Sequence, residues 1–442
     1  TIHNTLGIYE PAFREAYQWL SKQNVVEEQK IETALAQRYA SCPPVSQLLV
    51  QRGVTSVEEA DRFFNPRLKN LHDPYLMPDM DKAVERLNRA MGAKEKIMVY
   101  GDYDVDGTTA VALVYKYLSN FYSNIDYFIP TRYEEGYGIS SEIIDDFAGQ
   151  GVKLVIILDC GIKANEEIAH AREHGIDFII CDHHVPDEEL PQAVAILNPK
   201  MPGSTYPCPH LSGCGVGFKF MQAFAQSNGI AQGELEGMLD LVAVSIAADI
   251  VPMVDENRIM AYYGLRRLNT NPNMGLRAII RICNLTNREI TISDVIFKIG
   301  PRINASGRMQ SGKAAVDLLV SRDIADAYER AKDIDQYNRD RKELDKRITE
   351  EANAILSKRH EAESDKKTIV IFNKDWHKGI IGIVASRLTE LYYKPAVVLT
   401  LVNGLATGSS RSGQGSISTA LSTPPVICLK ISAATHMQWV YR

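Results

Sequence analysis

Between residues 96 and 198 the chain alternates short apolar runs, rich in Val and Ile, with helical stretches. Strands that are buried on both faces and separated by helices of about 10 to 15 residues are typical of right-handed βαβ units. The sequence therefore predicts an α/β fold with a mostly parallel βαβ sheet. The runs are KIMVY (96–100), NIDYFIP (124–130), KLVIIL (153–158), DFIIC (177–181) and VAILN (194–198).

The rest of the chain predicts further regions around this sheet. Residues 322–363 contain no Gly or Pro and many i,i+4 charge pairs, which predicts one long solvated helix that bridges two domains. After it, strand, helix and strand patterns predict a smaller α/β domain. The predicted regions are an N-terminal helical cap (1–92), a catalytic domain (93–321), the connector helix (322–363), the small α/β domain (364–412) and an atypical tail (413–442).

Charge and composition exclude some classes of protein. Lys and Arg number 49 against 55 Asp and Glu, a net charge of −6, so a uniformly basic nucleic-acid coat is excluded but a local basic groove is not. The most apolar stretch, 239–254, contains Asp240 and Asp249 and is too short and too charged to span a bilayer. No secretory signal is visible, and the seven cysteines lie mostly in apolar runs. We therefore expect a cytoplasmic protein with buried thiols and no membrane partner.

Acidic and imidazole side chains follow three of the predicted strands. Ligands of parallel sheets gather at the carboxyl ends of the strands, so these residues are the first candidates for a site. The first strand leads into Asp102, Asp104 and Asp106, the third into Asp159, and the fourth into Asp182, His183 and His184; Asp249 ends an apolar helical run.

This set of side chains favours a metal site. Carboxylate oxygens suit Mg²⁺ and Mn²⁺, and imidazole is a further ligand for Mn²⁺. The pair Asp104 and Asp106 alone fits an acidic surface turn equally well, but the adjacent His183 and His184 cannot both be satisfied inside a core. We therefore expect two ions about 3.5 to 4 Å apart, the usual arrangement for phosphoryl displacement.

The motifs VYGDYDVDG, ILDCG, CDHH and AAD resemble the DHH phosphoesterase superfamily, and GPRINASGRM with WHKGIIGIVASRL resembles the DHHA1 domain. Together, over about residues 60–412, they are similar to the RecJ family of bacterial single-strand-specific 5′ to 3′ DNA exonucleases. The resemblance implies two Mn²⁺ or Mg²⁺ ions. Their implied ligands are Asp104, Asp106, Asp159, His183 and Asp249, with Asp159 as the catalytic bridge.

The same resemblance gives roles to the neighbouring residues. His184 would face the scissile phosphate as a catalytic group, and Asp182 would orient an imidazole. Asp102, the outer acid of the first motif, is a possible further member of the site, and a solvated turn acid or an acceptor that orients a ligand is about equally open.

Arg serves best opposite the metals, because its fork pairs two phosphate oxygens. Arg132 directly follows a predicted strand, and the family resemblance implies that it holds the 5′ phosphate, with an ion pair to Glu134 or Glu135 as the alternative. Trp376 is either a stacking surface or a core residue. The other substrate-binding candidates are Arg302, Asn304, Ser306 and Arg308 in a predicted loop, His377, and Ser409 with Arg411 in the second part of the end-recognition pocket.

Three other patterns do not support a second chemistry. Residues 307–314 fit G-x4-G-K, but Ala314 replaces the Ser or Thr that binds Mg²⁺ and no strand precedes them. The glycines of 213–217 indicate a helix entry. Cys208, Cys214 and His210 are irregularly spaced and lack a fourth zinc ligand.

The resemblance stops after Ser412. With suitable codons, the neighbouring reading frame of 416–442 encodes a segment containing FGGH that restores the family pattern. We therefore hypothesise a single-nucleotide deletion near the codons for Gly415 and Ser416, which resequencing of the gene tests. On this hypothesis the OB-type domain is absent and strand grip is weakened, while the metal centre still forms.

The sequence thus predicts a two-metal 5′ to 3′ exonuclease that hydrolyses single-stranded DNA to mononucleotides in repair and recombination. The alternatives are a phosphodiesterase of short oligonucleotides or cyclic dinucleotides, and a catalytically silent nucleic-acid-binding relative. The expected partner is single-stranded DNA with a 5′ end, while repair-protein partners cannot be read from the sequence.

Overall fold

The computed structural model describes residues 31, 33–34, 48–131, 138–363, 367–402 and 404–412. The chain divides into two compact units, Thr1–Leu71 with Met253–Ile259, and His72–Pro252 with Met260–Arg442. Most of the predicted helical cap, Arg132 and the predicted tail lie outside the described residues.

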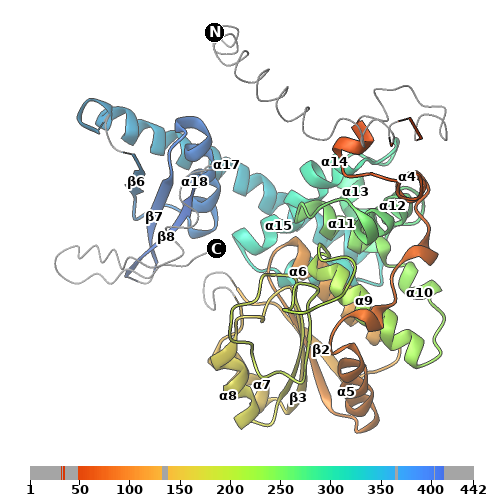
Figure 1. Ribbon diagram of the computed structural model, residues 1–442. Helices are drawn as coiled ribbons and strands as arrows, with labels where there is room; N and C mark the ends of the chain where they lie inside the picture. Colours follow the sequence, from red (N-terminus) through yellow and green to blue (C-terminus); the bar gives the residue numbers. More distant parts are fainter. Residues whose placement is uncertain are drawn as a thin grey trace. The chain divides into compact units, whose positions relative to one another are not determined.

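The larger unit contains a five-stranded, all-parallel sheet in the order β2-β1-β3-β4-β5, which confirms the predicted fold class. In the register, Gly101 pairs with Leu158 and Leu158 pairs with Cys181, so three strands end level with one another. The residues that follow them therefore emerge at one edge of the sheet (Figure 1). The strands are β1 (Lys96–Gly101), β2 (Ile125–Phe128), β3 (Val152–Leu158), β4 (Asp177–Cys181) and β5 (Ala195–Leu197).

Helices cover both faces of this sheet because alternate strand residues point to opposite faces. On one face Tyr100, Ile157 and Phe178 pack with Ile144 and Phe147, and α8 lies beside α7. On the other face α5, α6 and α9 contact the strands. These helices are α5 (Met80–Gly92), α6 (Val105–Leu118), α7 (Ser141–Gly149), α8 (Asn165–Glu173) and α9 (Gly213–Ser227).

Short helices make up most of the segment after α9. One of them corrects the sequence analysis, because GPRINASGRM is not a loop but the helix α15 (Gly300–Met309), which follows a π-helical turn, Val295–Ile299. Pro301 lies in the first turn of α15, directly after the π-helical turn, where a residue without an N–H interrupts the backbone hydrogen-bond ladder. A Cβ on Gly307 would lie 2.4 Å from the backbone oxygen of Tyr103, so this small residue serves close helix packing.

The other helices between α9 and the long helix near the end of the chain are α10 (Gly233–Glu236), α11 (Leu239–Ala248), α12 (Asp255–Thr270), α13 (Met274–Ile282), α14 (Ile292–Asp294) and α16 (Lys313–Val320). Before the sheet lie α4 (Val57–Phe64) and the 3₁₀ turns η1 (Leu68–Asn70) and η2 (Pro74–Leu76).

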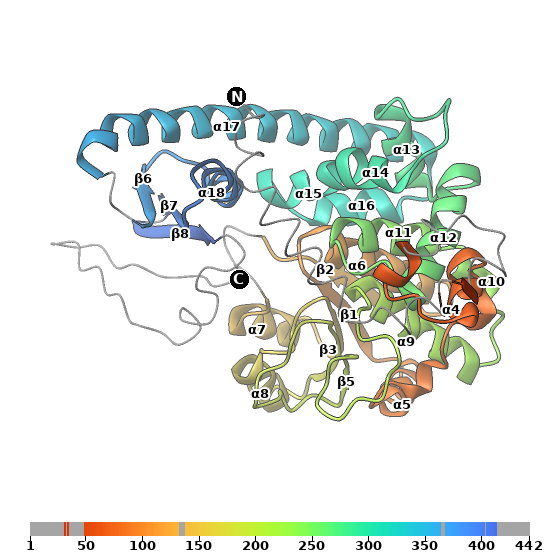
Figure 2. The same ribbon diagram turned by 45° about the horizontal axis from the view of Figure 1, so that its top comes forward.

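The predicted long helix is α17 (Ile324–Glu363), which leads to a second sheet of order β6-β7-β8 (Figure 2). One stripe of α17 is not solvated, because Ile348 and Ala352 belong to the second core. The antiparallel strand β8 was not predicted, since its sequence, LATGSSR, is polar and partly exposed. The elements are β6 (Ile369–Phe372), α18 (Lys378–Tyr392), β7 (Ala396–Val402) and β8 (Leu405–Arg411).

The described residues bear on two expectations from the composition, which concern membrane-spanning segments and the state of the cysteines. Among them, no helix is both long enough and apolar enough to cross a membrane. Cys160, Cys181, Cys208 and Cys214 are buried free thiols, and Cys283 is a partly buried one, which agrees with the predicted thiol state.

Candidate metal centre

The loop after β1 presents three aspartates at the start of α6. Asp104 caps the helix, and its Oδ1 accepts a hydrogen bond of 3.1 Å from the N–H of Gly107. Asp102 and Asp106 are buried. Gly107 lies inside the helix rather than at a turn before it. A Cβ there would lie 2.4 Å from the backbone oxygen of Asp102, so glycine lets the loop fold tightly onto α6.

Asp106 is fixed by the start of a different helix. Its two carboxylate oxygens accept hydrogen bonds from the N–H groups of Gly213 (2.6 Å) and Cys214 (2.7 Å), at the N-terminus of α9. The hydroxyl of Ser245 on α11 donates another, at 2.7 Å. The helix entry predicted at Gly213 is confirmed, but its role as an anion-binding turn was missed.

Asp159 follows β3 in a strained backbone conformation. Its φ is +60°, in the left-handed region that non-glycine residues rarely adopt. Its N–H donates to the carbonyl of Cys181 at 2.9 Å. A Cβ on Gly213 would lie 2.7 Å from the Cβ of Asp159, so α9 approaches closely because of that glycine. The backbone conformation and the packing of α9 thus hold the Asp159 carboxylate in a buried position.

Asp182 organises the two histidines that follow it. Its Oδ1 accepts hydrogen bonds from the N–H of His183 (2.7 Å), from the N–H of His184 (3.1 Å) and, at 2.8 Å, from the Nδ1 of His184. Its Oδ2 accepts one from the N–H of Ile162 at 3.1 Å. Burial alone would raise the pKa of Asp182, but these bonds, foremost that from His184, keep it below its usual value.

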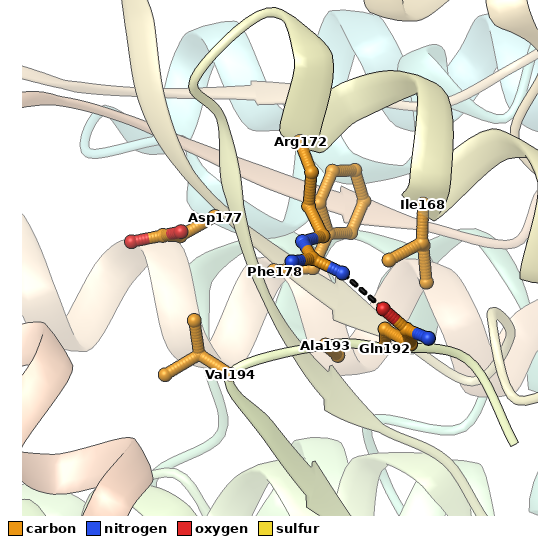
Figure 3. A pocket seen from close by; sticks show the side chains of 7 residues that line it. All are labelled: Ile168, Arg172, Asp177, Phe178, Gln192, Ala193 and Val194. Carbon is orange, nitrogen blue, oxygen red and sulfur yellow. Dashed lines mark hydrogen bonds between the residues drawn. The ribbon is translucent and has the colours of Figure 1, made fainter.

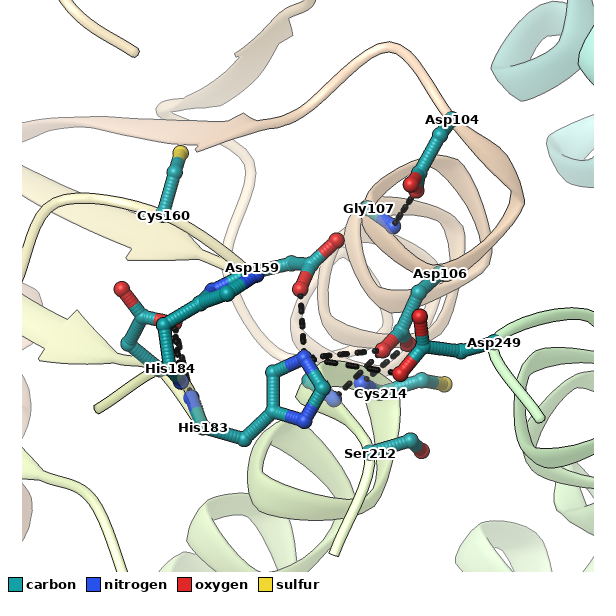
Figure 4. A network of polar contacts seen from close by, with 12 residues as sticks. Asp104, Asp106, Gly107, Asp159, Cys160, His183, His184, Ser212, Cys214 and Asp249 are labelled. Carbon is teal, nitrogen blue, oxygen red and sulfur yellow. Dashed lines mark hydrogen bonds and ion pairs between the residues drawn. The ribbon is translucent and has the colours of Figure 1, made fainter. Parts of the chain in front are cut away.

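The imidazole of His183 lies at the centre of the cluster (Figure 4). Its Nδ1 is 3.0 Å from the carbonyl oxygen of Leu211, the arrangement in which Nδ1 carries the proton. Its Nε2 then points at three carboxylates, 3.1 Å from Asp159 Oδ1, 3.6 Å from Asp249 Oδ2 and 3.7 Å from Asp106 Oδ2.

Two of the polar atoms that face one another in this cluster make no hydrogen bond within the part of the chain that the structure describes. Asp159 Oδ1 and His183 Nε2 are buried and have no hydrogen-bond partner among the described residues. Burial lowers the pKa of His183, although the Asp106 carboxylate opposes this, so a lone pair faces the carboxylate oxygens. Buried acceptors that converge in this way repel one another unless a proton or a cation lies between them.

The pKa values of the carboxylates in this cluster are raised as well. Burial, and then the neighbouring acids Asp106 and Asp104, raise the pKa of Asp159 well above its usual range. Burial also raises the pKa of Asp106, and it raises that of Asp249 to about 7, with Asp106 as the next cause. His184 is half-exposed, and its bond to Asp182 raises its pKa.

The donor set fits divalent cations. Three overlapping groups each bring their ligand atoms within 4.8 Å of one another, and together they contain every predicted ligand. Oxygen-rich groups with one or two imidazoles suit Mn²⁺ and Mg²⁺. The groups are Asp102 with Asp104 and Asp159, Asp106 with His183 and Asp249, and Asp159 with His183 and His184.

The candidates on α15 are held within the fold. Arg302 forms an ion pair of 2.8 Å with Asp335 on α17, and Ser306 is buried with its hydroxyl bonded to the carbonyl of Ile303. Asn304 is half-buried. Arg308 donates a hydrogen bond of 3.2 Å to the carbonyl of Gly379 at the start of α18. The structure thus places α15 between the metal cluster's helix α6 and the second core.

In the second sheet region, Trp376 is a core residue, because it is buried and its indole N–H donates to Glu351 at 2.7 Å. His377 is the residue before the first turn of α18, its side chain makes no capping hydrogen bond, and burial lowers its pKa. Arg411 lies beside Ser409 on β8, with its Nη1 3.3 Å from the hydroxyl oxygen. These two candidates therefore lie side by side on β8.

A separate hollow lies between α8 and the beginnings of β4 and β5 (Figure 3). It is lined by Ile168, Phe178 and Val194, and Arg172 is hydrogen-bonded to Gln192 across it. Because it opens at the start of the strands, it lies away from the edge that carries the metal cluster. It contributes no group to that site.

Comparisons with known proteins agree with this geometry. The family described as DHH family, N-terminal domain, matches residues 96–246, which span the whole five-stranded sheet. The chain is 38% identical over 392 residues to the single-stranded-DNA-specific exonuclease RecJ of Bacillus subtilis, covering 88% of this chain and 48% of that protein. It is 34% identical to the RecJ of Haemophilus influenzae, covering 87% of this chain and 68% of that protein.

Among solved structures, the crystal structure of RecJ in complex with Mn²⁺ from Thermus thermophilus is similar, with a TM-score of 0.73 and 26% identity. The match covers 88% of this chain and 54% of that one. The chain thus spans about half the length of the Bacillus subtilis and Thermus thermophilus relatives.

Proposed function

The chain belongs to the RecJ family of single-stranded-DNA-specific exonucleases, and from that premise we propose that it hydrolyses single-stranded DNA from the 5′ end to mononucleotides. The observation that supports this most is the Nε2 of His183, which faces three carboxylates without a hydrogen-bond partner. Metal-dependent phosphodiester hydrolases use such a site, and an ordinary protein core rarely contains buried acceptors that face one another without a partner.

Two divalent ions, Mn²⁺ or Mg²⁺, would be held by the buried cluster. When bound, such ions activate water and offset the charge that develops on the phosphate oxygens. Asp159 and His183 each lie in two of the three ligand groups. Asp159 is the proposed bridge, because its carboxylate has two oxygens to offer, whereas the Nδ1 of His183 already faces the carbonyl of Leu211. The other proposed ligands are Asp104, Asp106, His183 and Asp249, while Asp102, which shares a group with Asp104 and Asp159, is an additional candidate.

The other residues of the centre position these ligands and the substrate. The α9 amides and Ser245 keep the Asp106 carboxylate oriented before any ion arrives. Asp182 holds the half-exposed His184 and raises its pKa, so this imidazole is suited to donate a hydrogen bond to the scissile phosphate.

For the DNA strand we propose contacts on both sides of α15. Arg308 and His377 both lie near the start of α18, so they supply donors next to the metal centre's helices. Ser409 and Arg411 on β8 are suited to a terminal 5′ phosphate, together with Arg132, which lies outside the described residues. Arg302, Asn304 and Ser306 remain candidates on α15: Arg302 is paired with Asp335, Ser306 is buried with its hydroxyl bonded to Ile303, and Asn304 is half-buried.

The proposed setting is DNA repair and recombination in the cytoplasm. The five cysteines among the described residues are free thiols, which fits a reducing compartment. Partners in repair would be proteins that deliver single strands with a 5′ end.

The test is digestion of single strands labelled at the 5′ or the 3′ end, with Mn²⁺, alongside the same sequences as duplexes. We expect labelled mononucleotide to appear at once from the 5′-labelled strand and last from the 3′-labelled one, with the duplex resistant. Rapid cleavage of di- to tetranucleotides with no release of mononucleotides from long strands would favour a short-oligonucleotide phosphodiesterase instead. Endonucleolytic fragments, or release from the 3′ end first, would contradict the proposal.

A further inference from the structure

A second group of metal-ligand side chains lies on the helical layer that covers one face of the sheet. His170 lies in the last turn of α8 and His174 directly follows that helix, while Asp145 lies on the neighbouring helix α7. Asp145 Oδ1 is 2.7 Å from the Nε2 of His170 and 3.4 Å from the Nε2 of His174. The two imidazole rings are 4.6 Å apart, and all three ligand atoms lie within 4.8 Å of one another.

This group is separate from the strand-end centre. Helix α8 runs back from the carboxyl edge of the sheet, so His174 comes shortly before the start of β4, whereas Asp182 follows its end. Helices α7 and α8 lie side by side in both views (Figures 1 and 2). The group therefore shares no ligand with the centre at Asp159 and lies toward the other edge.

The spacing and chemistry of the group suit a transition-metal ion. Histidines four residues apart on a helix lie on one face one turn apart, the arrangement used by helix-borne zinc pairs. With Zn–N and Zn–O bonds of about 2.0 to 2.2 Å, tetrahedral ligand atoms lie roughly 3.4 Å apart. The separation of Asp145 Oδ1 from the Nε2 of His174 is 3.4 Å, which matches that value, and its separation from the Nε2 of His170 is 2.7 Å, which is shorter. Small side-chain rotations therefore complete the geometry.

We propose that Asp145, His170 and His174 bind one borderline divalent ion of the Zn²⁺ class, which cross-links α7 to α8. Two imidazoles and one carboxylate favour Zn²⁺ over the oxygen-preferring Mg²⁺. The side chain of Asp145 is 57% exposed, which leaves the fourth position open to water. The bound ion stabilises the helical layer over β3 and β4 and takes no part in the nuclease reaction.

The test counts Zn²⁺ ions bound per full-length chain by equilibrium dialysis, in the wild type and in the double variant His170→Gln/His174→Gln. All three ligands are partly exposed, so the variant should fold as the wild type does. We expect the variant to bind one Zn²⁺ fewer and to lose part of the Zn²⁺-induced rise in Tm. Excess Mg²⁺ should not displace this ion.

A matched pair of single variants sharpens the test. Asp145→Asn should weaken Zn²⁺ binding at this site at least tenfold, whereas Asp146→Asn should leave it unchanged, because Asp146 bonds Gln150 instead of the imidazoles. Equal Zn²⁺ counts and affinities in the wild type and the double variant would overturn the proposal. The three residues would then form only a histidine–aspartate ion pair.

Discussion

The strand-end cluster and the α7–α8 cluster use the same ligand types in opposite surroundings. At the strand ends, Asp106, Asp159 and His183 are buried, and the facing atoms of Asp159 and His183 lack hydrogen-bond partners. On the helices, Asp145 is exposed and lies within hydrogen-bond distance of His170. Desolvation is thus the main difference between the two groups.

That difference decides what each cluster is suited to do. In the buried cluster, desolvation and neighbouring acids raise the carboxylate pKa values, so the fold retains an arrangement that is unfavourable without cations. In the exposed cluster, water and protons satisfy the same groups at little cost. We therefore expect chemistry at the first and, at most, metal-dependent stability at the second.

The largest difference in nuclease rate between variants of the two clusters is expected when the proposed bridging carboxylate is removed. Asp159→Ala should lower the Mn²⁺-dependent rate on single-stranded DNA about 10³-fold or more, because metal ions supply several kcal/mol of charge stabilisation. Asp145→Ala should leave that rate unchanged. Nuclease rates near the wild-type value in Asp159→Ala would refute the proposed site.

A smaller loss is expected when the group that orients the histidines is neutralised. Asp182→Asn keeps the shape of the side chain but weakens the bond that holds His184. Changes to groups that orient metal ligands cost about 10- to 100-fold in metal affinity or activity. Mn²⁺ titration of the nuclease rate measures this, and its pH profile should shift as His184 loses its anionic partner. An unchanged pH profile would argue for a purely structural role of Asp182.

Loss of one hydrogen bond to Asp106 should have a still smaller effect. Ser245→Ala removes the hydroxyl donor but leaves the N–H groups of Gly213 and Cys214 in place. A hydrogen bond to a charged group contributes about 1.5 kcal/mol, so Mn²⁺ affinity should fall about tenfold. Ser357→Ala, on exposed α17 surface, is the control and should change nothing. Equal Mn²⁺ affinity in both variants would contradict the role given to Ser245.

The stabilisation by Mn²⁺ should depend on pH in a defined direction. The raised pKa values of Asp106, Asp159 and Asp249 (about 7 for Asp249) mean that the metal-free folded protein holds protons that the unfolded chain has already released. Its free energy of unfolding therefore falls as pH rises from about 4 toward 7. Mn²⁺ displaces these protons, so the Mn²⁺-induced rise in Tm should grow over the same window. A rise in Tm that is constant with pH would show that the carboxylates are already ionised.

The sequence predicted the sheet and the gathering of acidic and imidazole side chains at the strand ends, because both follow from local patterns. Apolar runs give the strands, and the level ends of β1, β3 and β4 bring Asp104, Asp159 and His183 together. The contacts of Asp106 with Gly213 and Ser245 could not be predicted, because they join segments far apart in the chain.

Other features escaped prediction for related reasons. The glycines and serines of α15 indicated a loop, but there Gly307 permits close packing of a helix against Tyr103. The convergence of Asp145 with His170 and His174 requires α7 to pack beside α8, and spacing within α8 alone does not imply a third ligand.

Anomalous diffraction of Mn²⁺ in crystals of the full chain tests directly whether the strand-end cluster binds two ions. We predict two peaks about 3.5 to 4 Å apart, within bonding distance of Asp106, Asp159, His183 and Asp249. If no peaks lie between these side chains, in crystals whose protein degrades single-stranded DNA with Mn²⁺, then this cluster does not hold the catalytic ions.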